Sequence, residues 1–124
     1  MENQKVLANI NSLKKKIKQN KDIEIIAISK RQPIERIVSA LDSGHKIFGE
    51  NQVQETINKW PVLRKKYSDI KLHLVGPLQS NKVKDAISIF DVIQTVDREK
   101  IAKALKKEEG NLKKKISYMI QINT

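Results

Sequence analysis

Lys30 is the residue of this chain whose type and position most clearly indicate chemistry. It directly follows an apolar stretch, residues 25–29, that has the composition of a buried strand. A lysine at the carboxyl end of such a strand is oddly placed for a solvated surface charge, and its amine is well placed for the mouth of a barrel. Lysine amines form imines with carbonyl cofactors. Lys30 is therefore the first candidate for a functional residue, and imine formation is its candidate chemistry.

Further polar side chains accompany other apolar stretches of the chain. Glu50 and Asn51 come after the second stretch, and a turn at Gly76 leads to Ser80 after the third. His73 lies within that third stretch. Functional residues of parallel α/β folds gather at the carboxyl ends of the strands. We therefore expect an amine, a carboxylate, amides and a hydroxyl to share one edge of the fold.

Each of these residues also has an ordinary structural explanation. An ion pair with Lys30 or with another cation explains Glu50 as well as a functional role does. Asn51 and Ser80 are good N-caps for the helices that follow them. His73, on a buried strand, is better explained as a hydrogen-bonded core histidine than as a ligand. The shared edge is stronger evidence than any one of these residues.

The apolar pattern predicts which elements hold these side chains. Ile10, Leu13 and Ile17 lie on one stripe of an N-terminal helix. Strands and amphipathic helices then alternate, with strands expected at residues 24–29, 46–49, 72–75, 92–96 and 116–122. Pro61 is expected to break or kink the helix after the second strand. Asp97 and Gly110 are expected to begin and end the helix after the fourth strand.

This alternation of strands and helices indicates a parallel sheet with right-handed crossovers. A doubly wound sheet and part of a (β/α) barrel both fit, and the periodicity does not choose between them. Neither a Gly-x-Gly-x-x-Gly motif nor a Walker lysine motif follows the first predicted strand. That weighs against a dinucleotide-binding or P-loop sheet.

The composition excludes several classes of protein. The 124 residues leave room for one modest domain, expected to span residues 1–124. The chain has no cysteine and its two histidines lie on different elements, so we expect neither a disulfide framework nor a protein-built metal site. No apolar stretch approaches the ~20 residues of a membrane span, and no apolar signal segment follows the first residues. A cytoplasmic location without membrane contact is expected.

The formal net charge of +11 raises the alternative of a basic nucleic-acid-binding module. Most of the basic residues are lysines spread along helix faces, which is typical of a general compositional bias. Aromatic residues, which stack on bases, make up only 4% of the chain, and none interleaves with a basic cluster. We expect weak, salt-sensitive association with polyanions and no specific nucleic-acid partner.

Three segments of the sequence carry a family resemblance. They are Ile-Ala-Ile-Ser-Lys at residues 26–30, Phe-Gly-Glu-Asn-Gln-Val-Gln-Glu at 48–55, and His-Leu-Val-Gly-Pro-Leu-Gln-Ser-Asn-Lys at 73–82. In this order, and with the 96–98 turn and the 120–123 strand after them, they resemble the pyridoxal phosphate homeostasis protein family. The resemblance covers nearly the whole chain, and the Gly-Glu-Asn and Gly-Pro-Leu-Gln-Ser-Asn-Lys blocks are highly specific.

The resemblance implies a fold, a ligand and a role. The implied fold is α/β: a partial (β/α) TIM-type barrel of the alanine racemase N-terminal type, with about five parallel strands and an extra N-terminal helix. The implied ligand is pyridoxal 5'-phosphate (PLP), and the implied role is intracellular vitamin B6 homeostasis without enzymatic turnover. Lys30 matches the family's Schiff-base lysine, and Asn51 matches a position beside the cofactor. His73 and Ser80 are further candidates for the same site.

A related alternative is a PLP-dependent amino-acid racemase. Such an enzyme needs a second acid or base within reach of the substrate α-carbon. The only tyrosines are Tyr67, predicted in a connection between a helix and a strand, and Tyr118, predicted inside a strand. Neither position suits that proton transfer, so the sequence favours cofactor binding without turnover.

The chain departs from the family in length. The resemblance implies three further strands and segments that hold the cofactor phosphate, and this sequence lacks them. Phosphate contacts anchor PLP, so we expect weak affinity for it. Five strands do not close an eight-stranded barrel, and open apolar edges are a liability in water. We therefore expect self-association through those edges, rearrangement to an open sheet or dependence on a missing C-terminal half.

Overall fold

The computed structural model describes residues 2–17 and 23–122, in which helices and strands alternate as expected. Asn123, at the end of the last predicted pattern, lies outside the described residues. The elements are α1 (Glu2–Ile17), β1 (Ala27–Ile28), α2 (Ile34–Asp42), β2 (Ile47–Glu50), α3 (Val53–Lys66), β3 (Lys71–Leu74), the 3₁₀ helix η1 (Ser80–Lys82), α4 (Val83–Ile89), β4 (Val92–Val96), α5 (Glu99–Leu112) and β5 (Ser117–Ile120).

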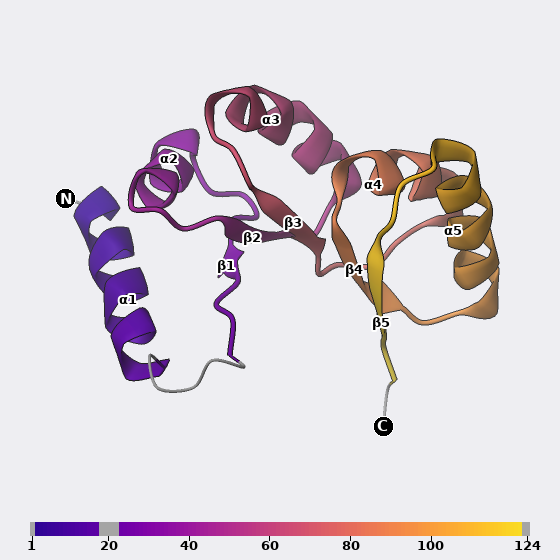
Figure 1. The fold of residues 1–124 in the computed structure, drawn as a ribbon, viewed down its shortest axis with the longest axis horizontal. Coiled ribbons are helices and arrows are strands. Elements are labelled where there is room, and N and C mark those ends of the chain that lie inside the picture. Colours follow the sequence, from indigo (N-terminus) through magenta and orange to yellow (C-terminus); the bar gives the residue numbers. More distant parts are fainter. Residues whose placement is uncertain (1, 18–22, 123–124) are drawn as a thin grey trace.

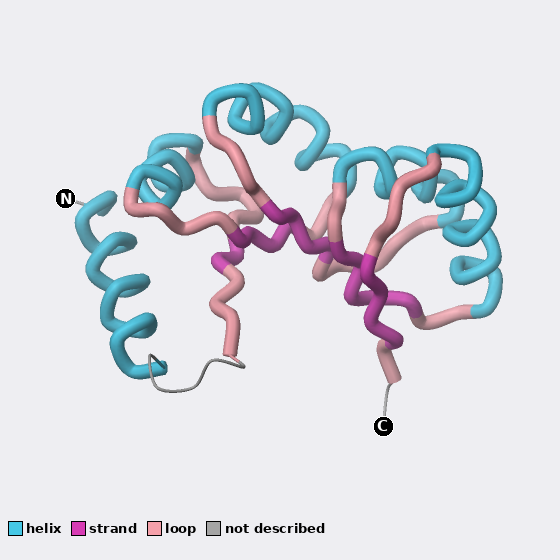
Figure 2. Tube along the Cα trace, viewed as in Figure 1, coloured by secondary structure: helices cyan, strands magenta, loops and turns pink. Residues whose placement is uncertain are grey.

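The strands form one parallel sheet in the order β1-β2-β3-β4-β5. A doubly wound sheet reverses its strand order part-way and carries helices on both faces, whereas a (β/α) barrel adds each strand beside the previous one. Figures 1 and 2 show α2 to α5 along one side of the row of strands. The structure is therefore the expected partial TIM-type barrel.

The two faces of the sheet have different surroundings. One face packs against the helices: Phe48 of β2 lies 4.9 Å from Trp60 of α3, measured between ring centroids. The opposite face, which we call the open face, carries one residue in register from each strand of this sheet: Ile28, Gly49, His73, Val92 and Ser117. In the described part of the chain no helix covers this face (Figure 1). Ile28 is 49% exposed on it, so the expectation that the first strand is buried on both sides is wrong.

The core lies between the sheet and the helices. Its fully buried side chains come from both layers and include Trp60, Phe48, Phe90, Leu72, Leu74, Ile87, Ile93 and Ile101. Asp91 joins the layers at the edge of this core, because its Oδ2 accepts hydrogen bonds from Arg64 Nη2 of α3 at 2.7 Å and from the backbone N–H of Leu72 at 2.9 Å. This packing fixes the positions of β2, β3 and β4 along the strand direction relative to one another. Those positions set where the carboxyl ends of the three strands lie.

Several predicted boundaries differ from the structure. The first strand is only Ala27–Ile28, and α3 continues through Pro61 to Lys66. Trp60 and Leu63 are buried on either side of the exposed Pro61, so packing outweighs the lost hydrogen bond. Helix α5 begins at Glu99 without a side-chain cap from Asp97 and runs past Gly110 to Leu112.

Two further searches concern the described ranges only. No helix within them is long and apolar enough to cross a membrane. No three histidine, aspartate or glutamate side chains within them come together as a metal site.

Candidate functional site

The carboxyl ends of β1 and β2 place Lys30 beside Asn51. Ile28 pairs with Gly49, and the Ser29 N–H continues the ladder to the Gly49 carbonyl at 2.9 Å. Lys30 and Asn51 each come two residues after a paired residue of the open face, so they end neighbouring strands. Lys30 is exposed in the turn after β1, and its amine has no hydrogen bond or ion pair among the described residues. Such an amine is accessible to a carbonyl compound.

Asn51 is half-buried in the bend between β2 and α3. It does not cap α3 as its position suggested, because Gln52 is the N-cap residue and makes no side-chain cap bond. The Oδ1 atom of Asn51 is buried without a hydrogen-bond partner in the described structure. Asn51 also lines a hollow of about 400 Å³, together with Gln79 and Lys82. A buried amide oxygen needs a donor, and a group in this hollow is one source of it.

His73 and Ser80 are placed differently from Lys30 and Asn51. His73 is 5% exposed, and its Nδ1 donates to Oε1 of Gln94 on the neighbouring strand at 3.1 Å. His73 is therefore buried and hydrogen-bonded as expected, although it lies on the open face and not between the sheet and the helices. Ser80 is exposed as the first residue of η1, and Lys82 occupies the N-cap of α4 without a side-chain cap bond, so the capping explanation of Ser80 is wrong. A role in binding stays a prediction for both residues.

Glu50 is fully buried and points to α3, on the helix side of the sheet. Its Oε2 accepts hydrogen bonds from Ser29 Oγ at 2.5 Å and from Trp60 Nε1 at 3.0 Å. The same oxygen lies 2.9 Å from Lys59 Nζ, and both side chains of this ion pair are nearly or fully buried. The structure therefore supports the structural explanation of Glu50, with Lys59 rather than Lys30 as its cation.

Two residues of α3, Lys59 and Glu55, form hydrogen bonds with the backbone on either side of Lys30. Neither of them was identified as a candidate from the sequence. Lys59 Nζ donates to the Ser29 carbonyl at 2.9 Å, and Glu55 Oε1 accepts from the Arg31 N–H at 2.7 Å. A glutamate four residues before a lysine on a helix is typical of an exposed surface pair, which hides this role. Glu50 was the sequence feature that could have indicated Lys59, because a carboxylate on a buried strand needs a cation close by.

Both tyrosines donate hydrogen bonds to carboxylates away from the open face. Tyr67 donates to Asp42 at 2.6 Å, and this hydrogen bond raises the tyrosine pKa. Tyr118 pairs in register with Ile93 on the helix side and donates to Glu109 at 2.5 Å. Burial, and then this bond, raises the pKa of Tyr118. Neither tyrosine comes near the Lys30 turn.

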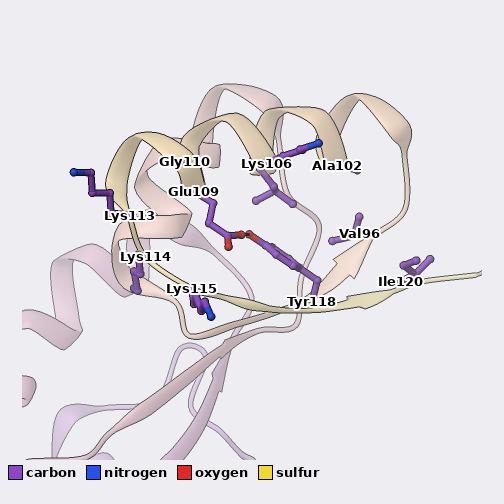
Figure 3. A pocket seen from close by; sticks show the side chains of 11 residues that line it. Val96, Ala102, Lys106, Glu109, Gly110, Lys113, Lys114, Lys115, Tyr118 and Ile120 are labelled. Atoms are coloured by element: carbon purple, nitrogen blue, oxygen red, sulfur yellow. Dashed lines mark hydrogen bonds between the residues drawn. The ribbon is translucent and has the colours of Figure 1, made fainter.

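A second hollow, of about 680 Å³, lies between α5 and β5 (Figure 3). Val96, Ala102 and Leu105 supply apolar side chains to it, and Lys106 and Lys113 lie at its rim. The Tyr118 and Glu109 pair crosses it, as Figure 3 shows. Its lysines lie on α5 or in the segment before β5, and none follows the carboxyl end of a strand, where functional residues of such folds gather, so we place the candidate site at the strand ends.

Comparison with known proteins assigns the fold to a family. Residues 2–124 match the family model of the alanine racemase N-terminal domain. The chain belongs to this family. Its fold is also that of an alanine racemase from Clostridium difficile, which superposes with a TM-score of 0.72 at 16% identity over 96% of this chain and 34% of the racemase.

More similar relatives confirm the resemblance found in the sequence. Pyridoxal phosphate homeostasis proteins of Pasteurella multocida and of Buchnera aphidicola from Schizaphis graminum are 42% and 46% identical, over 82% and 93% of this chain and 43% and 53% of theirs. PipY of Synechococcus elongatus, solved with PLP bound, superposes with a TM-score of 0.89 at 33% identity, over 95% of this chain and 54% of PipY. The chain spans about half the length of these relatives.

Proposed function

We propose that this chain binds PLP and takes part in intracellular vitamin B6 homeostasis, with Lys30 as the covalent anchor. The observation that carries the proposal is an exposed lysine amine without a partner at a barrel-strand end, in a fold that superposes on PLP-bound PipY. PLP would supply an aldehyde carbon that the Lys30 amine captures with loss of water, and an electron-withdrawing ring. Residues 1–124 then act as one domain, the N-terminal part of a PLP-binding barrel.

The residues around Lys30 fit such a group. The Asn51 amide oxygen is buried and lacks a donor, so it suits a hydrogen-bond donor on a ligand beside Lys30. Lys82 lines the same hollow and supplies positive charge for an anionic ligand. His73, on the open face, and Ser80, exposed after β3, complete the proposed set as secondary contacts.

We propose binding without turnover. Racemisation at an amino-acid α-carbon needs an acid or base opposite the cofactor lysine. Tyr67 and Tyr118 both donate to carboxylates on the helix side, and the pKa of each is raised, which makes the phenolate harder to form. The proposal includes a cytoplasmic location, no specific nucleic-acid partner, no membrane partner, and self-association through the open sheet edges.

Borohydride trapping tests Lys30 directly. Protein incubated with PLP and then reduced is expected to carry the pyridoxyl mass on the peptide that contains Lys30, at PLP concentrations that leave most other lysines unlabelled. Lys30→Ala is expected to lose the imine absorption band, while Lys66→Ala, which removes an exposed lysine at the far end of α3, keeps it. Equal bands and equal labelling in wild type and Lys30→Ala would show that Lys30 is not the anchor.

A further inference from the structure

The turn that carries Lys30 is held on both sides by one helix. The Ser29 carbonyl, in the peptide before Lys30, accepts from Lys59 Nζ at 2.9 Å. The Arg31 N–H, in the peptide after Lys30, donates to Glu55 Oε1 at 2.7 Å. Glu55 and Lys59 lie one turn apart on α3, with 3.4 Å between Lys59 Nζ and Glu55 Oε1. Both peptide groups that flank Lys30 are thus hydrogen-bonded to side chains on one turn of α3. We call these two hydrogen bonds, from Lys59 and to Glu55, the clamp.

The Lys59 end of this clamp is fixed in the core. The Lys59 side chain is 9% exposed and pairs with the fully buried Glu50 at 2.9 Å. Trp60 and Ser29 also donate to Glu50, so the carboxylate links β1, β2 and α3. Charged hydrogen bonds in such surroundings are stronger than they are in water.

The backbone after Lys30 needs such support. Arg31 has a φ of 57°, in the left-handed region that residues other than glycine seldom adopt. A residue keeps such a conformation when surrounding contacts favour it over the alternatives. The hydrogen bond from its N–H to Glu55 is a contact of that kind.

We propose that Glu55 and Lys59 are positioning residues for Lys30. They fix the peptide groups before and after it, so that the amine leaves the turn toward the end of β2 and Asn51. Neither residue touches the cofactor in this proposal, which rests on the proposed function of Lys30. In this proposal the position of the Lys30 amine depends on side chains of α3 as well as on the end of β1.

Glu55 is the residue to change, because its side chain is 25% exposed and its loss leaves the buried Glu50–Lys59 pair intact. Glu55→Ala removes the acceptor for the Arg31 N–H, whereas Glu55→Gln retains an amide oxygen there. We expect Glu55→Ala to lower the rate of pyridoxyl labelling at Lys30 by about tenfold, the effect of losing one hydrogen bond to a charged group. We expect Glu55→Gln to restore most of the rate.

Hydrogen exchange of the Arg31 amide, followed by NMR without PLP, gives a second readout that does not depend on the cofactor. It should be faster in Glu55→Ala and close to wild type in Glu55→Gln. Glu99→Ala is the control, because it removes the exposed i,i+4 pair with Lys103 on α5 and should change neither readout.

The two readouts separate the ways in which the proposal can fail. Faster Arg31 exchange with unchanged labelling in Glu55→Ala would show that the turn loosens without affecting Lys30, and unchanged exchange would show that the contact does not hold the turn. Either result overturns the positioning role. Absence of labelling at Lys30 in the wild-type protein would instead overturn the proposed function, and the positioning role with it.

Discussion

Gly49 and Gly76, near the ends of β2 and β3, lie in contrasting surroundings. A Cβ atom at Gly76 would lie 2.2 Å from the backbone oxygen of Asn51 and 2.8 Å from its Cβ. A Cβ atom at Gly49 would lie 2.7 Å from Cδ1 of Ile28, the end of a flexible and half-exposed side chain. The close approach at Gly76 therefore involves the Asn51 backbone, which cannot move freely. This contact fixes the position of Asn51 relative to the end of β3.

Alanine substitutions at these glycines should have unequal effects. Gly76→Ala is expected to lower the free energy of unfolding by about 1–3 kcal/mol, because the Asn51 backbone must shift. Gly49→Ala should cost less, because the end of the Ile28 side chain can turn toward solvent on the open face. Urea unfolding followed by circular dichroism measures both values. Equal losses would mean that the Gly76–Asn51 approach is not tighter than the Gly49 contact.

Among the site residues, the sequence correctly predicted which of them lie at strand ends. It did not predict which side chains contact one another across the fold. Lys30 and Asn51 fall at strand ends because the apolar stretches before them are strands. The cation that pairs with Glu50 comes from the following helix, nine residues later, and its identity depends on how α3 packs on the sheet. No local pattern encodes that docking.

Between elements, Lys114 holds the end of α4. Its Nζ donates to the carbonyl oxygens of Ile87 at 2.9 Å, Phe90 at 3.1 Å and Ser88 at 3.3 Å. The last carbonyls of a helix have no partner within it, and α4 has only seven residues. Burial lowers the pKa of Lys114, although the nearby Asp91 charge opposes that shift. The lysine thus joins the segment before β5 to the end of α4, the helix that follows β3.

Replacing Lys114 by methionine, which keeps much of the apolar stem, should remove this cap. We expect a loss of about 1–3 kcal/mol in the free energy of unfolding, because three carbonyl groups lose a charged donor. Lys115→Met removes an exposed lysine at the next position and should change stability by less than about 0.5 kcal/mol. Thermal and urea unfolding of the two variants would decide the matter, and matching stabilities would contradict the capping role.

The order of helices and strands was predictable because apolar periodicity reports it directly. The helix boundaries at Asp97 and Gly110 and the continuity of α3 through Pro61 were not, because tertiary packing decides them. The buried residues Ile101 and Leu105 anchor α5 in the core, and the helix extends past Gly110, where a Cβ would meet nothing within 4 Å. Tertiary packing outweighs a propensity difference of about 1 kcal/mol.

Over the whole molecule, the sequential strand order gives the sheet two edges, at β1 and β5. The periodicity allowed both a doubly wound sheet and a barrel, and the family resemblance pointed to the barrel. The distinction lies in which strand pairs with which, a property of long-range contacts that local pattern does not carry. The helices on one side of the sheet and the open face on the other follow from this order (Figure 1).

The β5 edge combines unpaired backbone with exposed apolar side chains. Ile120 and Ile122 are each 77% exposed, and Met119 is 47% exposed. An edge strand of this kind is a template for pairing with another chain. The net charge of +11 opposes association of two copies, and this repulsion weakens as salt screens it over about 10 Å at 0.1 M. Association through β5 should therefore increase with both protein and salt concentration.

Sedimentation velocity of matched variants tests whether this edge drives association. Wild type should shift from monomer toward larger species as protein concentration and salt rise, and Ile120→Lys should remain monomeric because a charge on the edge strand disfavours pairing. Val62→Lys adds the same charge at a 69% exposed position on α3 and should behave like wild type. If Val62→Lys and Ile120→Lys suppressed association equally, net charge rather than the β5 edge would control it. A wild-type protein that stays monomeric throughout would show that the exposed edge is tolerated, with its apolar side chains solvated as single residues.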